Sequence, residues 1–143
     1  MTSETPFSTT PSVLFVCSKN GGKSQMAAGL MTLEAGQSVT VTSAGTKPGS
    51  EINALSAEVL LDLGVDIRNE KPKALTEENM RAVDLVVVLG TEATVPELDG
   101  VVVEVWETDE PSLRGIDGRE RMELVRDDIH GRVKELKTRL LAR

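Results

Sequence analysis

The segment after the first apolar run of this sequence contains residues that could bind and attack an anion. Val13–Val16 are apolar and lead to Cys17, the only cysteine, and glycine, lysine and small polar residues follow as far as Ser24. Where a strand, a tight loop and a helix N-terminus meet, their backbone amides converge on one point and bind oxyanions. The same positive field stabilises a thiolate, which is the nucleophilic form of cysteine. The segment is therefore a candidate oxyanion site with Cys17 as its nucleophile.

The loop residues decide between this interpretation and a simpler one. A lone cysteine after an apolar strand is usually a small residue of the hydrophobic core. Asn20, Gly21 and Gly22, however, permit positive φ and a close approach of the backbone, Lys23 adds a cation, and Ser24 adds a hydroxyl donor at the helix start. A core cysteine needs none of these features, so the pattern C-x5-K-S favours an anion site. The nucleotide-binding pattern G-x4-G-K-[ST] is not met, because the cysteine stands where its first glycine is required.

Hydrophobic periodicity predicts the strands and helices that position this loop. The predicted strands are Val13–Cys17, Val39–Ser43, Leu85–Leu89 and Val101–Trp106. The predicted helices run from Ser24 to about Ala35, from about Leu55 to Leu63, over a short stretch from Thr76, and from a capping pair of Asp117 and Glu120 to Leu140.

The predicted order of the elements is βαβα(α)βαβα, which also places a helix between the last two strands. This order implies a right-handed, mostly parallel sheet with helices on both faces. Ligands of such sheets bind beyond the carboxyl ends of the strands, and Cys17 lies at one of these ends.

Composition limits the remaining possibilities. The 143 residues are enough for one domain, predicted over residues 13–143, after a Thr-, Ser- and Pro-rich flexible arm at residues 1–12. The sequence contains no apolar run long enough to span a membrane, and its net charge of −7 argues against a nucleic-acid partner. One cysteine excludes an intrachain disulfide and fits a reducing cytoplasm. We expect a cytoplasmic monomer.

Four motifs together resemble the arsenate reductases built on the low-molecular-weight tyrosine phosphatase fold. They are V-L-F-V-C-x-x-N-x-G-K-S-Q-M-A from Val13, T-S-A-G-T from Thr42, W-E-T-D-E-P-S from Trp106 and V-R-D-D-I from Val125. The similarity extends from about Val13 to the final helix, in the order of the family. It implies a three-layer α/β/α fold with a four-stranded parallel sheet.

The resemblance also implies roles for individual residues. Cys17 would be the nucleophile, Ser24 would donate a hydrogen bond to its thiolate, and a carboxylic acid before Pro111 would protonate the leaving group. The residues that would wrap the oxyanion are Ser18, Lys19, Asn20, Gly21, Gly22 and Lys23. The general acid is either Asp109 or Glu110, and the alternative is that this acidic pair is only a solvated turn.

Three departures from the family pattern bear on the substrate and on bound ions. The family usually has arginine where this chain has Lys23, and an ammonium cannot grip two oxyanion oxygens as a guanidinium does. The tyrosines that flank a phosphotyrosine pocket are absent, because the chain has no tyrosine. Both features argue against an efficient phosphatase. Ala28 stands where the potassium-binding members have glutamate, so we expect no metal ion.

The electron source is the fourth departure. Thioredoxin-coupled members use further cysteines, one of them near Leu89–Thr91, and this chain has none there. The sequence therefore resembles the class that condenses arsenate with mycothiol and releases arsenite through mycoredoxin, a glutaredoxin-like protein. Mycothiol would be a co-substrate, and no bound cofactor is expected. A low-molecular-weight tyrosine phosphatase and a non-catalytic module that binds oxyanions or senses oxidants remain as alternatives.

Overall fold

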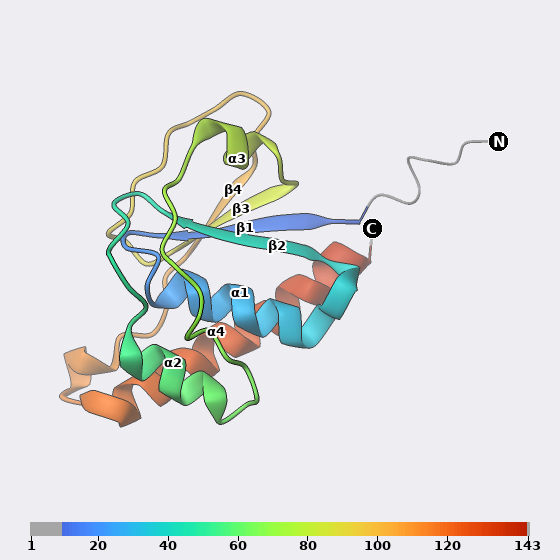
Figure 1. Cartoon of the computed structure of the whole chain (residues 1–143). Coiled ribbons are helices and arrows are strands. Elements are labelled where there is room, and N and C mark those ends of the chain that lie inside the picture. The colour runs from blue at the N-terminus through green and yellow to red at the C-terminus, as the bar shows by residue number, and fades with distance from the viewer. Residues whose placement is uncertain (1–9, 143) are drawn as a thin grey trace.

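A four-stranded parallel sheet forms the centre of the computed structural model, which describes residues 10–142 (Figure 1). The strands are β1 (Ser12–Cys17), β2 (Thr40–Gly45), β3 (Leu85–Leu89) and β4 (Val103–Trp106). Their order across the sheet is β2-β1-β3-β4, and every neighbouring pair is parallel. The predicted four-stranded parallel sheet is thereby confirmed.

Helices cover both faces of the sheet, as predicted, but unequally. The helices are α1 (Lys23–Ala35), α2 (Ala54–Leu61), α3 (Glu77–Arg81) and α4 (Gly118–Leu141), with 3-10 turns η2 (Gly36–Ser38) and η3 (Pro111–Arg114). Figure 1 shows α1, α2 and α4 on one face and the short α3 on the other. Because side chains alternate along a strand, Val13 and Phe15 of β1 pack with the three-helix layer, whereas Leu14 and Val16 face the side of α3.

The predicted helix between the last two strands is wrong. Residues 90–102 contain no helix and instead cross the α3 side of the sheet as a loop. Gly90 and Gly100 bound this loop with φ values of 86° and 81°, and Pro96 lies inside it, where its ring would break a helix. Val95, Leu98 and other apolar side chains of the loop pack on the sheet, so the loop takes the place of a helical layer.

Element boundaries follow local chemistry. β1 begins at Ser12, one residue earlier than predicted, where the Ser12 amide donates to Asp84 Oδ2 at 2.9 Å and the Asp84 amide donates back to Ser12 Oγ at 3.0 Å. The predicted flexible arm therefore loses Ser12 to the sheet, and its residues 1–9 lie outside the described residues. Gly36 ends α1 with a φ of 56°, as expected for a glycine stop.

The predicted capping pair of α4 is wrong in its hydrogen bonds, although the helix begins where predicted. Asp117 is the N-cap residue, but its side chain makes no capping hydrogen bond. Gly118, the first helical residue, has a φ of 65°, which lies outside the helical region and turns the chain away from capping geometry. Among residues 10–142, no helix is both long enough and apolar enough to cross a bilayer.

Candidate active site

Cys17 is the last residue of β1, and the loop of residues 18–22 joins it to the N-terminus of α1. Its side chain is buried, with 8% of the residue exposed, and it lines a cavity of about 530 Å³. Other lining residues come from α1, from the end of β3 and the loop after it, from the loop after β4 and from α4: Lys23, Leu89, Glu92, Thr108, Glu110 and Arg121. The cysteine is thus neither sealed in the core nor on the open surface.

Two groups contact the sulfur of Cys17. Ser24 Oγ lies 2.9 Å from it, and the Asn20 amide donates to it at 3.3 Å. Because Asn20 Nδ2 already donates to Ser24 Oγ at 2.7 Å, the hydroxyl hydrogen of Ser24 is left to donate to the sulfur. Both contacts thus offer a hydrogen to the thiolate, as expected for Ser24 from the sequence.

The loop carbonyls show which way the loop amides face. Five successive carbonyls, from Cys17 to Gly21, accept hydrogen bonds from groups around the loop. The donors are, in order, the amides of Thr46, Lys47 and Gly49, the side-chain amide of Gln25, and the amide of Asn53. The peptide bonds of the described residues are all trans, so the N–H that follows each outward carbonyl points to the inside of the loop. The loop therefore presents a concave set of amides beside the sulfur, an arrangement that could bind an oxyanion.

Asn20 is the hub of this loop. It is fully buried and has a φ of 54°, the only positive φ of a non-glycine residue among residues 10–142. Its Oδ1 accepts from the Lys73 amide at 2.9 Å and from Gln25 Nε2 at 3.2 Å, while its Nδ2 donates to Ser24. The side chain therefore fixes both the loop and the hydroxyl that contacts the sulfur.

The glycines act through their size. Gly21 and Gly22 do not adopt positive φ. In the Asn-Gly-Gly segment only Asn20 has the positive φ that the sequence permits there. A Cβ on Gly21 would lie 2.9 Å from the carbonyl oxygen of Glu51, and one on Gly45 of β2 would lie 2.7 Å from that of Ser18. Both positions need glycine because another segment of backbone passes too close for a side chain.

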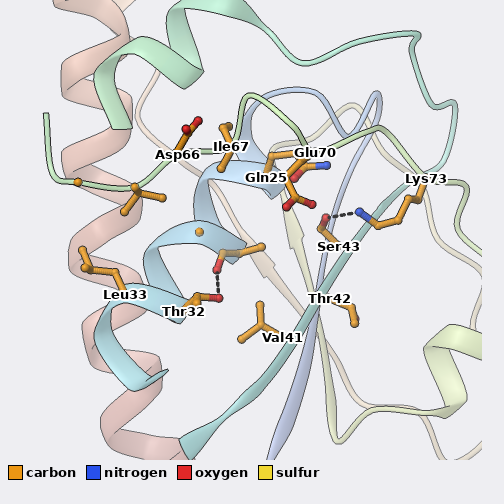
Figure 2. Close-up of a pocket in the computed structure, with 14 residues that line it drawn as sticks. Gln25, Thr32, Leu33, Val41, Thr42, Ser43, Asp66, Ile67, Glu70 and Lys73 are labelled. Carbon is orange, nitrogen blue, oxygen red and sulfur yellow. Dashed lines mark hydrogen bonds between the residues drawn. The ribbon is translucent and has the colours of Figure 1, made fainter. Parts of the chain in front are cut away.

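Figure 2 shows a second cavity, of about 600 Å³, between α1, β2 and the segment of residues 64–73. Gln25, Ser43 and Lys73 are among its lining residues, and Lys73 Nζ donates to Ser43 Oγ at 3.3 Å. None of its lining residues lines the Cys17 cavity. It therefore borders the groups that hold Asn20 and has no access to the sulfur.

The two predicted acids are separated by the structure. Glu110 lines the Cys17 cavity and Asp109 does not. The Asp109 carboxylate accepts from Arg114 at 2.8 and 3.1 Å, and this arginine lowers the pKa of Asp109. Glu110 accepts from Arg121 at 2.8 and 3.1 Å. Hydrogen bonds from Arg121 and from Ser112 lower the pKa of Glu110 to about 2.

Arg121 is the site residue that sequence reasoning missed. The sequence offers it no motif, and the loop arginines Arg114 and Arg119 are equally plausible there. Arg119 does not line the Cys17 cavity and instead forms ion pairs with Glu58, Asp62 and Glu123. The one usable signal for Arg121 is its position beside Met122, which begins the buried stripe of α4 and so puts Arg121 at the edge of that stripe.

The chain belongs to the low molecular weight phosphotyrosine protein phosphatase family, whose sequence model matches residues 12–143. Arsenate reductase 1 of Staphylococcus haemolyticus is 32% identical over 134 residues, which are 90% of this chain and 96% of that protein. The glutaredoxin arsenate reductase of Synechocystis is 30% identical over 135 residues, covering 92% of this chain and 96% of the relative.

A solved structure gives the same result. The thioredoxin-dependent arsenate reductase of Corynebacterium glutamicum superposes with a TM-score of 0.78 at 38% identity. The match covers 94% of this chain and 64% of that one, so this chain spans less than two thirds of the length of that protein. The predicted family and fold are confirmed.

Proposed function

We propose that this protein reduces arsenate to arsenite for arsenate detoxification, with Cys17 as the nucleophile. The observation that carries the proposal is the sulfur of Cys17 in a cavity, 2.9 Å from Ser24 Oγ and beside inward-facing loop amides. Such donors stabilise the thiolate before attack and the oxyanion during it. The relatives that cover most of the chain are named arsenate reductases, which supports arsenate as the substrate.

In the first step the Cys17 thiolate attacks the arsenic of the dihydrogen arsenate monoanion. A sulfur–arsenic bond forms, an arsenic–oxygen bond breaks, and one water molecule leaves. The product is a dianion in which the Cys17 sulfur carries arsenic with its three remaining oxygens. The loop amides of residues 18–22 and the ammonium of Lys23 hold these oxygens. The sequence contains no second cysteine, so the next thiol must come from another molecule.

We assign this second thiol to mycothiol. Its sulfur replaces that of Cys17 on arsenic, which regenerates the Cys17 thiol. A thiolate of mycoredoxin then attacks the mycothiol sulfur, forms a mixed disulfide and leaves two electrons on arsenic, which departs as arsenite. Leu89, Gly90 and Thr91 line the Cys17 cavity but carry no thiol, which supports an external donor. We expect this chemistry in the cytoplasm and in a monomer.

The test is steady-state turnover of purified protein with arsenate, mycothiol and mycoredoxin, followed by the consumption of reductant. Turnover is expected with the unchanged protein and is expected to be lost in Cys17→Ser. A parallel reaction with thioredoxin in place of mycothiol and mycoredoxin should be inactive. Activity that persists in Cys17→Ser, or turnover with thioredoxin alone, contradicts the proposal. Steady-state turnover also separates an enzyme from a module that only binds oxyanions or becomes oxidised.

Hydrolysis of phosphate monoesters is the second candidate activity, because the family model is that of a phosphatase and the loop amides would bind phosphate as well. Lys23 is the residue that disfavours it, since a single ammonium grips a bulky monoester less firmly than a guanidinium. Lys23→Arg is therefore expected to raise the hydrolysis of a chromogenic phosphate monoester. An unchanged or lower rate would contradict this account of Lys23.

A further inference from the structure

Every hydrogen-bonding neighbour of the Glu110 carboxylate is a donor. Arg121 Nε and Ser112 Oγ both donate to Oε2 at 2.8 Å, and Arg121 Nη2 donates to Oε1 at 3.1 Å. Lys23 Nζ lies 3.9 Å from Oε1. A general acid must carry a proton on one of these oxygens, and Arg121 and Lys23 cannot accept that proton, which leaves the hydroxyl of Ser112, if it rotates, as the one acceptor among these neighbours. The geometry therefore opposes the protonated form.

Charged groups surround Glu110 from every element at the cavity. Lys19 comes from the Cys17 loop (residues 18–22), Lys23 from α1 and Glu92 from the loop after β3. Glu107 and Asp109 come from the acidic loop (residues 107–114), and Arg121 comes from α4. Burial favours the protonated form of Glu110, but the hydrogen bonds from Arg121 and Ser112, with the positive charges of Arg121 and Lys23, outweigh it and lower the pKa of Glu110 to about 2. The carboxyl is therefore ionised at neutral pH.

We infer that Arg121 is a positioning residue that holds the Glu110 carboxylate by hydrogen bonds, so that Glu110 does not donate a proton at the Cys17 site. The site thereby selects substrates that themselves carry the proton needed by their leaving group. This inference rests on the proposed function and assigns the substrate preference of the same site. The family offers the loop carboxylate as a general acid, and in this chain Arg121 removes it from that role.

The chemistry of the two candidate substrates differs in this one proton. The dihydrogen arsenate monoanion has two hydroxyls, and when one leaves the other supplies the proton that turns it into water. A phosphate monoester dianion has no such proton, so its alkoxide or phenoxide must be protonated by the protein. With Glu110 held by Arg121, arsenate can react and an ester with a poor leaving group cannot. The site therefore discriminates by protonation, in addition to the weaker grip of Lys23.

The test measures kcat/KM for the dianion of phenyl phosphate, whose leaving group needs a proton, between pH 4.5 and 8, with each rate divided by the fraction of the substrate that is dianion, because the second pKa of such an ester is about 6. In Arg121→Gln the Glu110 carboxyl loses its main donor, so its pKa rises and the protonated form becomes populated as the pH falls. The expected gain over the unchanged protein is about tenfold at pH 5, fading as the pH rises. The double variant Arg121→Gln with Glu110→Gln should lose this gain. Arg119→Gln, two residues away on the same helix, is the matched control and should show none.

The inference is overturned if Arg121→Gln shows no gain, or if the double variant or Arg119→Gln shows the same gain. Should Arg121→Gln fail to fold by circular dichroism, the arsenate pH profile decides. An acidic group that must be protonated for arsenate turnover, and that disappears in Glu110→Gln, would show that Glu110 acts as the acid after all. Failure of the proposed function is distinguishable, because a Cys17-dependent gain on phenyl phosphate without any arsenate turnover would remove arsenate and leave the role of Arg121 intact.

Discussion

Two loops meet at the Cys17 cavity and are held in place by different forces. At the Cys17 loop (residues 18–22), four backbone amides and the side-chain amide of Gln25 fix five successive carbonyls from Cys17 to Gly21, and both Asn20 of the loop and Ser24 are fully buried. In the acidic loop (residues 107–114), Asp109 and Glu110 are each held by one arginine, with about a third of each side chain exposed. Leu113 of the same loop is 86% exposed.

This difference suits the two tasks. A buried network is costly to disturb, because each lost partner leaves a polar group unsatisfied in a medium of low dielectric. An exposed ion pair contributes little and is weakened by salt. The sulfur and the oxyanion donors are thus kept rigid, whereas the loop that borders the entrance is held by contacts that can be exchanged. The following substitutions and conditions test this contrast.

Asn20→Ala should have the largest effect, because it breaks the hub of the rigid loop. It removes the donor to Ser24 Oγ, leaves the Lys73 amide without its acceptor and puts alanine at a φ of 54°. We expect a loss of about 2–4 kcal/mol in the free energy of unfolding, measured in urea. Arsenate turnover should fall at least ~100-fold, since small misplacements of reacting groups have effects of this size. Asn20→Gly is the control that retains access to positive φ; equal losses of stability and activity in both variants would mean that backbone strain contributes nothing measurable.

Gly45→Ala should be next, because its Cβ would press on the loop from below. The nearest atoms are the Ser18 carbonyl oxygen at 2.7 Å, the Asn20 Cβ at 2.9 Å and the Asn20 amide nitrogen at 3.0 Å; a Cβ moves with its backbone, so the loop itself must shift. We expect a loss of about 1–3 kcal/mol on urea unfolding, together with reduced arsenate turnover. Gly131→Ala is the matched control: nothing lies within 4 Å of its Cβ and it is in the middle of α4, so alanine there should stabilise by about 0.5–1 kcal/mol. If Gly45→Ala left both the free energy of unfolding and arsenate turnover unchanged, the loop would not be rigid.

Glu110→Gln should change stability much less, and in a pH-dependent way. The pKa of Glu110 is lowered from 4.5 to about 2 in the folded protein, so its contribution is fully present above pH 4.5 and is lost as the pH falls towards 2. For a pair with about a third of each side chain exposed, this contribution is below about 1 kcal/mol. The melting temperatures of the unchanged protein and the variant should therefore converge between pH 4.5 and 2, and added salt should bring them together at neutral pH. A difference between the two melting temperatures that widens on acidification would mean that the ion pair affects stability in the opposite direction to the one expected.

Inert salt should have the smallest effect on activity. The net charge of −7 repels an anionic substrate at long range, and moderate salt screens that repulsion, while the loop amides act at contact and are not screened. The kcat/KM for arsenate should change by less than about twofold between low salt and physiological ionic strength, and any change should be a rise. A steep fall would require a long-range attractive field, and substrate capture would then depend on surface charges in place of the loop amides.

The sequence by itself determined those features whose causes are local. β3 spans the predicted residues Leu85–Leu89, because an apolar run between Asp84 and Gly90 can only be a buried strand. The Cys17 loop could be predicted equally well, since the sulfur, the loop and the start of the helix lie in one run of eight residues. The predictions that were wrong, the helix after β3 and the capping pair of α4, both fall where a glycine with positive φ redirects the chain.

Only the tertiary structure decided which distant groups meet at the sulfur. The need for glycine at position 45 comes from the Cys17 loop passing over β2, and nothing in the T-S-A-G-T motif alone reveals that contact. Glu110 lines the Cys17 cavity and Asp109 does not, and Arg121 donates to Glu110. Both facts depend on how α4 is rotated about its own axis. That rotation is set by the packing of Met122 and Val125 against the core, a sum of many contacts between segments far apart in the chain. The surroundings of the proposed nucleophile are thus defined by its neighbours in sequence, and the carboxylate and arginine near it by neighbours that only folding brings together.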